Sequence, residues 1–120
     1  MITDAGLSFN LTDEKQILKI DSPRDQLGGP WFVVHTDVQH RWAIVVMHWN
    51  KKPCLGIRWF YGSQGTPSVR GYGTWFVIPD QLANAILDKL PIALQKRSEI
   101  DEILLGKISK KELKIKYKRK

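Results

Sequence analysis

The sequence predicts an α+β fold in which a four-stranded antiparallel sheet, built as a meander, is followed by an amphipathic helix. Extended runs with a two-residue apolar period predict the strands, because alternate side chains of a strand point to opposite faces. The short polar connections between these runs favour antiparallel neighbours. A proline then precedes residues with helical apolar spacing, which is typical of a helix start. At 120 residues and 42% hydrophobic composition, the chain has the length of one domain.

The four expected strands cover residues 31–36, 41–49, 55–61 and 74–78. The second run is almost continuously apolar, which favours a central strand covered on both faces over part of its length. A glycine-rich reversal, residues 62–73, separates the last two strands. The helix begins after Pro79, and we expect its apolar residues to be buried against one face of the sheet. They are Leu82, Ala85, Ile86 and Leu90. The opposite face of the sheet would stay open or meet a second copy of the chain.

Two segments flank this core domain of residues 31–90. In the N-terminal segment, residues 1–30, positions 17–21 are compatible with an edge strand, and residues 21–30 have loop composition. In residues 91–120, we expect a short helix from Ser98 and then a mobile basic tail over residues 107–120. The first ten residues lack the pattern of a secretory signal, and the single cysteine, Cys54, fits a reducing compartment. A cytoplasmic location is therefore expected.

The formal net charge of +7 is unevenly distributed. Residues 91–120 contain ten Lys or Arg and four Asp or Glu, so they carry most of the excess. No acid occurs between Asp37 and Asp80, although five cations fall inside that window. A positive surface of this kind attracts polyanions, and a solvated basic face that only promotes solubility is the alternative.

The sequence contains no arrangement of residues that indicates catalysis. His35, His40 and His48 lack the paired spacing of a metal site. The glycine-rich segment lacks the Lys-Ser/Thr of a phosphate-binding loop and joins strand to strand. The acids avoid the expected sheet, so a carboxylate pair for acid–base chemistry has no obvious place. We therefore expect a non-enzymatic protein without a cofactor or metal.

Aromatic residues among cations point instead to single-stranded nucleic acid. Ten of the twelve aromatic residues lie between Trp31 and Phe76, and rings on an open sheet face stack on unpaired bases while cations neutralise phosphates. Because Ile57 and Trp59 would face the helix, Arg58 and Phe60 are expected on the open face. The expected phosphate contacts are Arg41, Lys51, Lys52, Arg58 and Arg70, and the expected stacking residues are Trp49, Phe60 and Trp75. In the alternative interpretation, the aromatic face is the interface of a protein-interaction or dimerisation module.

The segment from Ile57 to Leu82 resembles the C-terminal domain of the transcriptional coactivator positive cofactor four. There too, an Ile-Arg-aromatic strand leads through a glycine-containing turn to a short strand and a Pro-acid-Gln helix start. The matching residues are Ile57, Arg58, Gly73, Pro79, Asp80, Gln81 and Leu82. The resemblance covers about residues 31–90 and implies the fold shared with the Whirly proteins, in which a curved sheet precedes a helix. It also implies a homodimer that binds single-stranded DNA or RNA with a role in transcription regulation. This chain departs from that pattern by a longer, less basic loop at residues 62–73 and by its C-terminal extension.

Overall fold

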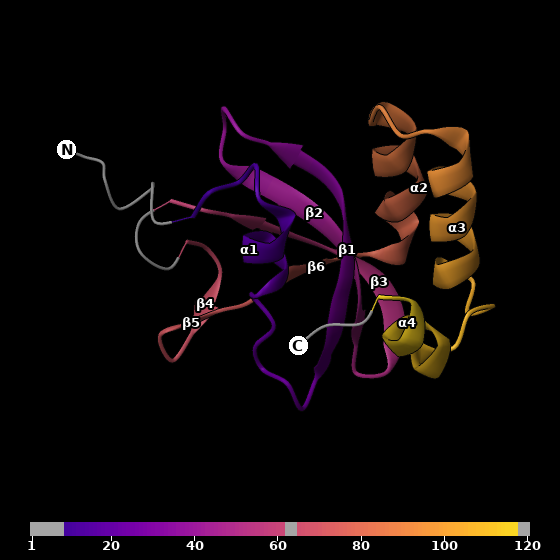
Figure 1. The fold of residues 1–120 in the computed structure, drawn as a ribbon, viewed down its shortest axis with the longest axis horizontal. Helices are drawn as coiled ribbons and strands as arrows, with labels where there is room; N and C mark the ends of the chain where they lie inside the picture. Colours follow the sequence, from indigo (N-terminus) through magenta and orange to yellow (C-terminus); the bar gives the residue numbers. More distant parts are fainter. Residues whose placement is uncertain (1–8, 62–64, 118–120) are drawn as a thin grey trace.

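A four-stranded antiparallel sheet forms the centre of the protein, in the order β1-β2-β3-β6 (Figure 1). The computed structural model describes residues 9–61 and 65–117. The strands of the sheet are β1 (Leu27–Asp37), β2 (Trp42–Trp49), β3 (Lys52–Trp59) and β6 (Phe76–Ile78). This architecture, with helices following the sheet, confirms the predicted α+β fold.

The other elements in the described residues are a small hairpin and four helices. The hairpin consists of β4 (Ser68–Val69) and β5 (Tyr72–Gly73), and it lies within the predicted glycine-rich reversal, of which residues 62–64 are outside the described part. The helices are α1 (Glu14–Leu18), α2 (Asp80–Lys89), α3 (Leu94–Leu104) and α4 (Lys110–Lys116). None of the helices in the described residues is long and apolar enough to cross a membrane.

The central position of β2 explains its almost continuously apolar sequence. Residues Ala43 to His48 are all buried, and β2 pairs with β1 on one side and with β3 on the other. Side chains of β2 therefore need apolar neighbours on both faces of the sheet. The predicted two-sided burial of this strand is confirmed.

Helices α2, α3 and α4 cover one face of the sheet. Buried side chains from all three helices, such as Leu87, Ile103 and Leu113, form one core with Phe32 and Leu55 of the sheet. The buried face of α2 is rotated from the one we predicted: Ala83 and Leu87 are its buried residues. By contrast, Leu82 is 52% exposed and Ala85 is exposed, so the prediction is wrong for both. Ile86 and Leu90 are partly buried at the margin of this core.

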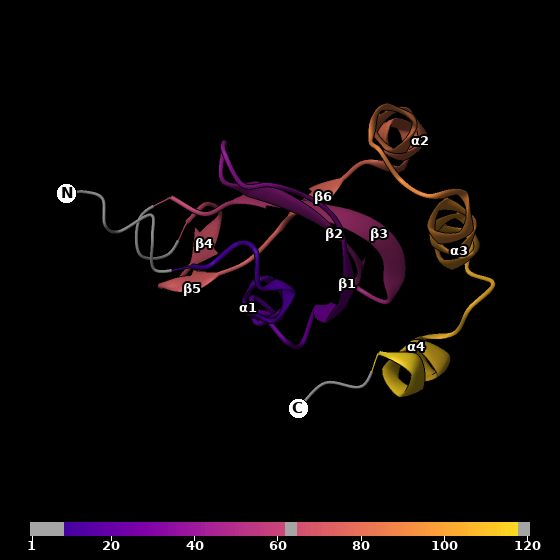
Figure 2. The same cartoon turned by 45° about the horizontal axis from the view of Figure 1, so that its top comes forward.

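The opposite face of the sheet is also covered, so the prediction of an open face there is wrong. The sheet curves around α1, and the other helices lie outside the curve (Figure 2). Leu11 and Ile17 from the N-terminal segment are 3% and 0% exposed, and they form a second core with Val45 and Met47 of the sheet. The chain thus fills this face with its own N-terminal residues, because both faces of the central strands are apolar.

The N-terminal segment forms a helix, α1, where the sequence is compatible with an edge strand. Asp13 caps α1, since its side chain accepts a hydrogen bond from the backbone N–H of Lys15. Ile17, which we had placed in the strand, is the buried residue of this helix. Strand β1 begins at Leu27, inside the segment predicted as a loop. The first eight residues, which carry most of the segment considered for a secretory signal, lie outside the described part.

The basic tail is folded as far as Tyr117, so the prediction of a mobile arm is wrong for the described part. Ser109 and Glu112 form a capping box at the start of α4, and Leu113 is completely buried. The preceding helix, α3, begins at Leu94, four residues before the predicted start at Ser98. Residues 118–120 lie outside the described residues.

One carboxylate of α3 holds the end of α4 in place. Glu99 accepts hydrogen bonds from Lys116, at 2.6 Å, from Lys96, at 3.3 Å, and from the hydroxyl of Tyr117. Burial by itself would raise the pKa of Glu99, but these donors hold it at about 2. The Tyr117 ring also lies 4.9 Å from the ring of Phe32 in β1. Helix α4 is therefore attached to both α3 and the sheet.

Candidate nucleic-acid interface

Arg58 lies in the interior of the protein and not on an open face. Its side chain leaves β3 on the face opposite Ile57, as predicted, but the residue is 0% exposed. The guanidinium Nη1 donates to the backbone carbonyl oxygens of Thr74, at 2.7 Å, and Pro67, at 3.3 Å. Burial lowers the pKa of Arg58 to about 10. In this structure its guanidinium fixes the glycine-rich segment and does not present itself to a ligand.

The aromatic residues predicted to flank Arg58 are buried with it. Phe60 and Trp75 are 0% and 3% exposed, and their ring centroids lie 6.3 Å apart. Trp75 donates its indole N–H to the backbone oxygen of Ile20 at 2.6 Å. The predicted placement of Phe60 and Trp75 on an accessible stacking surface is therefore wrong, because the N-terminal segment covers this face.

The other predicted cations are spread over the surface. Arg41 is half-buried, and its guanidinium donates to the backbone oxygens of Phe9 and Phe60, each at 3.2 Å. Lys51 is exposed in the turn at the other end of β2, and Arg70 is exposed in the turn between β4 and β5. These positions do not form one continuous cationic site.

Lys52 and Trp49 lie near the same turn as Lys51. The Nζ atom of Lys52 is 2.6 Å from a carboxylate oxygen of Asp80, and the pKa of Lys52 is raised by this hydrogen bond. Both side chains are largely exposed, so solvent weakens the pair. Trp49 is half-buried at the end of β2 and belongs to the N-terminal side of the sheet. Of the three predicted stacking residues, it is the one that keeps accessible surface.

A partly exposed aromatic surface lies on the helix-covered face, at the margin of the core that the helices form with the sheet. We define the aromatic strip as His35, Trp42, Ile57, Trp59 and Phe76. Trp42 and Trp59 are directly opposite each other on β2 and β3, and Phe76 of β6 is opposite Ile57. Phe76 is 47% exposed, and the other four residues are half-buried. The strip thus crosses all four strands of the sheet.

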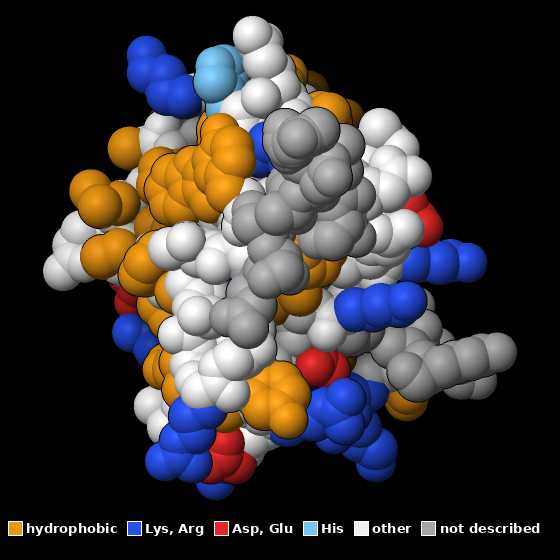
Figure 3. All heavy atoms as spheres, turned by 90° about the vertical axis from the view of Figure 1, so that its left-hand side faces the viewer, with side chains coloured by type: hydrophobic (Ala, Val, Ile, Leu, Met, Phe, Trp, Pro, Cys, Tyr) orange, Lys and Arg blue, Asp and Glu red, His pale blue; other side chains and the backbone are white. Residues whose placement is uncertain are grey.

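The position of the helices explains why these side chains are only partly covered. The next row of the same face, including Val46 and Leu55, is buried under α2, α3 and α4. Helices α2, α3 and α4 lie at one side of the molecule, and the connection between β1 and β2 lies on the side away from them (Figure 1). An eight-residue strand is about 26 Å long, whereas a helix is about 10 Å wide. Viewed from the side away from the helices, hydrophobic side chains gather on part of the surface, with Lys and Arg at its edges (Figure 3).

The strip is aromatic but not itself basic. It contains no lysine or arginine, and Asp37 is the strand partner of Trp42 on the same face. Hydrogen bonds from the backbone and ring of His40, at 2.9 and 3.0 Å, keep the pKa of Asp37 below its usual value. The ring of His35 is 5.4 Å from the ring of Trp42. Contacts to phosphates must therefore come from neighbouring surfaces.

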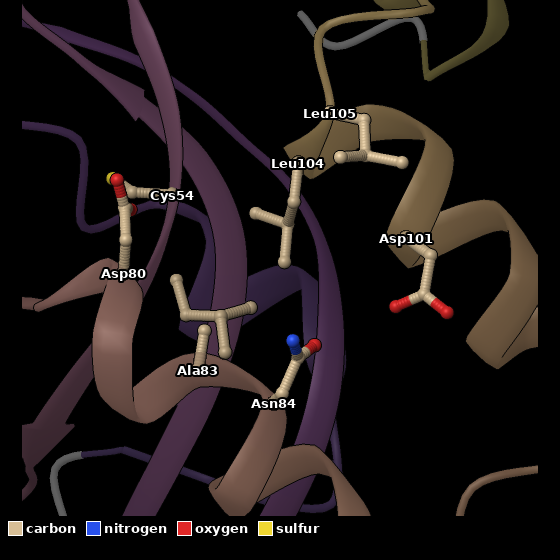
Figure 4. A pocket seen from close by; sticks show the side chains of 8 residues that line it. Cys54, Asp80, Ala83, Asn84, Asp101, Leu104 and Leu105 are labelled. Atoms are coloured by element: carbon tan, nitrogen blue, oxygen red, sulfur yellow. The ribbon is translucent and has the colours of Figure 1, made fainter.

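A pocket of about 470 Å³ lies between β3, α2 and α3 (Figure 4). Its lining includes the apolar side chains of Ala83 and Leu104 and the carboxylates of Asp80 and Asp101. Asp80 pairs with Lys52, and Asp101 accepts a hydrogen bond from Arg97 at 3.0 Å.

The chemistry of this pocket gives no support for catalysis. Burial raises the pKa of the Cys54 thiol at its edge to about 12, so the nucleophilic thiolate is scarce at neutral pH. Among residues 9–61 and 65–117, no group of three or more His, Cys, Asp or Glu side chains is arranged to hold a metal ion.

Sequence reasoning placed Trp59 and Ile57 correctly on the helix side but overlooked the strip. The period of two already put Trp42 on the same face as Ile44 and Val46. A helix is about 10 Å wide and cannot cover the whole length of a longer strand, so the sequence already indicated that part of this face stays exposed. Searches with protein-family models, curated protein sequences and solved structures find no significant match to the chain.

Proposed function

We propose that the protein is a non-enzymatic binder of single-stranded nucleic acid that stacks unpaired bases on the aromatic strip. The observation that carries this proposal is the accessible pair Trp42 and Trp59 on neighbouring strands, flanked by Phe76 and His35. Flat rings that a rigid sheet holds side by side offer a stacking surface that requires little ordering on binding. The transcription-regulatory role implied by the resemblance to positive cofactor four would depend on this activity.

The overall charge supports a polyanionic partner. The net charge is +7, and association of a cationic protein with nucleic acid is driven largely by release of counterions from the phosphates. Single strands suit the strip better than a duplex, because bases in a duplex are already stacked and their faces are inaccessible. Binding should therefore favour single-stranded over double-stranded DNA and should weaken as the salt concentration rises.

The experiment is a binding titration of single-stranded and double-stranded oligonucleotides at two salt concentrations. Trp59→Leu should weaken single-strand binding by about 5- to 150-fold, which corresponds to about 1–3 kcal/mol for one stacked base. Trp49→Leu is the matched control, since Trp49 is also half-buried but lies on the other side of the sheet. Unchanged binding by the Trp59 variant, or a loss equal to that of the control, would rule out stacking on the strip.

A second candidate function is a protein-interaction or homodimerisation module. It is favoured by the absence of lysine and arginine from the strip and by the carboxylate of Asp37 beside Trp42. Protein interfaces are enriched in aromatic residues and depleted in lysine relative to the rest of the surface. This function predicts that the wild-type protein forms a dimer in solution, measured by light scattering, and that Trp59→Leu makes it monomeric without any nucleic acid present.

A further inference from the structure

A row of exposed lysines runs along helix α4 and the segment that precedes it. Leu113 is completely buried and Tyr117 is attached to Glu99, so these residues define the inner side of the helix. At 100° per residue, Lys111 lies on the outer side and Lys114 flanks it. We define the basic ridge as Lys107, Lys110, Lys111 and Lys114, all of which are exposed.

The ridge has a positive charge that neighbouring acids do not cancel. Within the described residues, no member of the ridge forms an ion pair, whereas Lys116 of the same helix pairs with Glu99. The one acid of α4, Glu112, is used in the capping box with Ser109. A lysine near the C-terminus of a helix stabilises that helix through its dipole. Lys107 and Lys110 lie instead at the N-terminal side of α4, where a positive charge is unfavourable, so the dipole does not explain their presence.

The ridge lies on the same side of the sheet as the aromatic strip. Tyr117 at the end of α4 contacts Phe32 of β1, and His35 of the strip is three residues further along that strand. Lys110 of the ridge lies against Gly28 of the same strand, seven residues from His35, and seven residues of a strand span about 23 Å. A single strand of several nucleotides therefore has the length to contact both surfaces.

We propose that the basic ridge of α4 binds the phosphate backbone of the nucleic-acid strand whose bases stack on the aromatic strip. This inference rests on the proposed function and assigns the electrostatic contacts that the strip itself does not provide. Helix α4 is held in place because Lys116 pairs with Glu99 and the ring of Tyr117 packs against Phe32, so binding does not have to order the helix first. The strip would thus select unpaired bases, and the ridge would supply affinity without regard to sequence.

The test compares two triple variants of the full chain that lose the same charge. The ridge variant is Lys107→Gln, Lys111→Gln and Lys114→Gln, which keeps Lys110 because its side chain lies against Gly28. The control variant is Lys15→Gln, Lys19→Gln and Lys89→Gln. These three exposed lysines lie in α1, at its C-cap and in α2, and they form no ion pair within the described residues. Circular dichroism confirms that both variants fold. Affinity for a single-stranded oligonucleotide of about 15 nucleotides is measured over a range of salt concentrations.

The ridge variant should reduce the slope of log affinity against log salt by about 2, because each lost phosphate contact contributes about 0.7 for a single strand. The control variant should change the slope by less than half of this. Equal slopes for the two variants would overturn the proposal. Elution from heparin, a polyanion without bases, should show the same difference between them. The heparin result tests the ridge independently of base stacking, so failure of the Trp59 experiment and failure of the ridge are distinguishable.

Discussion

The guanidinium of Arg58 lies over the ring of Phe60 in the interior of the protein, with 4.9 Å between its Cζ atom and the ring centroid. Gly65 and Gly73 leave the space that the guanidinium occupies, since a Cβ atom at either residue would overlap it. The cation is thus enclosed by an aromatic ring, backbone carbonyl groups and two glycines. A buried arginine of this kind stabilises the fold because its charged guanidinium donates hydrogen bonds to backbone carbonyl groups in the interior, here those of Thr74 and Pro67.

Arg58→Ala should therefore destabilise the protein, by about 2–4 kcal/mol, because hydrogen bonds from a charged donor are lost and a cavity is left. Arg58→Lys should recover part of this, since an ammonium group does not reproduce the planar fork of the guanidinium. The measurement is urea unfolding of the three proteins. A loss below about 0.5 kcal/mol, the range typical of exposed positions, would contradict the structural role.

The hydrogen bond between Trp31 and His48 should make stability depend on pH. The indole N–H of Trp31 donates to Nδ1 of His48 at 3.0 Å, so His48 must be neutral at that nitrogen. Burial lowers the pKa of His48 from 6.5, and the nearby Lys110 adds to the shift. The unfolded chain thus binds more protons than the folded chain below about pH 6.5, and stability falls as the pH is lowered through this range.

The check is the melting temperature between pH 7.5 and pH 5 for the wild type and for His48→Gln, which cannot be protonated. The variant should lose less stability across this interval than the wild type, whatever its stability at pH 7.5. His35 and His40 are present in both proteins, so their contribution cancels in the comparison. Parallel curves would show that His48 does not carry the pH dependence.

Substitution by alanine should affect the free energy of unfolding differently at two leucines of α2. Leu87 is 1% exposed, so Leu87→Ala should cost about 2–5 kcal/mol as a large-to-small change in the core. Leu82 is 52% exposed, and Leu82→Ala should change the free energy of unfolding by less than about 0.5 kcal/mol. Chemical unfolding of both variants measures the difference. Equal losses would mean that α2 is rotated from the orientation described.

A similar pair tests whether the basic tail is part of the fold. Leu113 is completely buried, and Leu113→Ala should lower the free energy of unfolding by about 2–5 kcal/mol. Ile115 of the same helix is 70% exposed, so Ile115→Ala should have little effect. Deletion of residues 107–120 should destabilise the protein as well, in contrast to what the lysine-rich composition suggested. An unchanged free energy of unfolding after this deletion would show that α4 does not contribute to the core.

The order of the strands and the main helix after the sheet were predictable from local patterns. Alternation along β3 placed Ile57 and Arg58 on opposite faces, and Pro79 marked the start of α2. The buried face of α2 was less predictable, because Leu82 and Leu87 fit different helical stripes of the same ten-residue helix. Which stripe faces the sheet depends on how the connection from β6 directs the helix, and no local pattern contains that information.

The sequence by itself determined the antiparallel meander, because the period of the apolar residues and the turn residues act over a few neighbouring positions. It also determined that the protein is basic and that its aromatic residues gather in the sheet. Only the tertiary structure decided which rings stay accessible. Leu11 and Ile17, from a distant part of the chain, belong to the core that buries Phe60 and Trp75, whereas α2, α3 and α4 leave Trp42 and Trp59 only half-buried. Burial depends on these long-range contacts, and a strand carries the same alternation whether its outer neighbour is water or another segment of the chain.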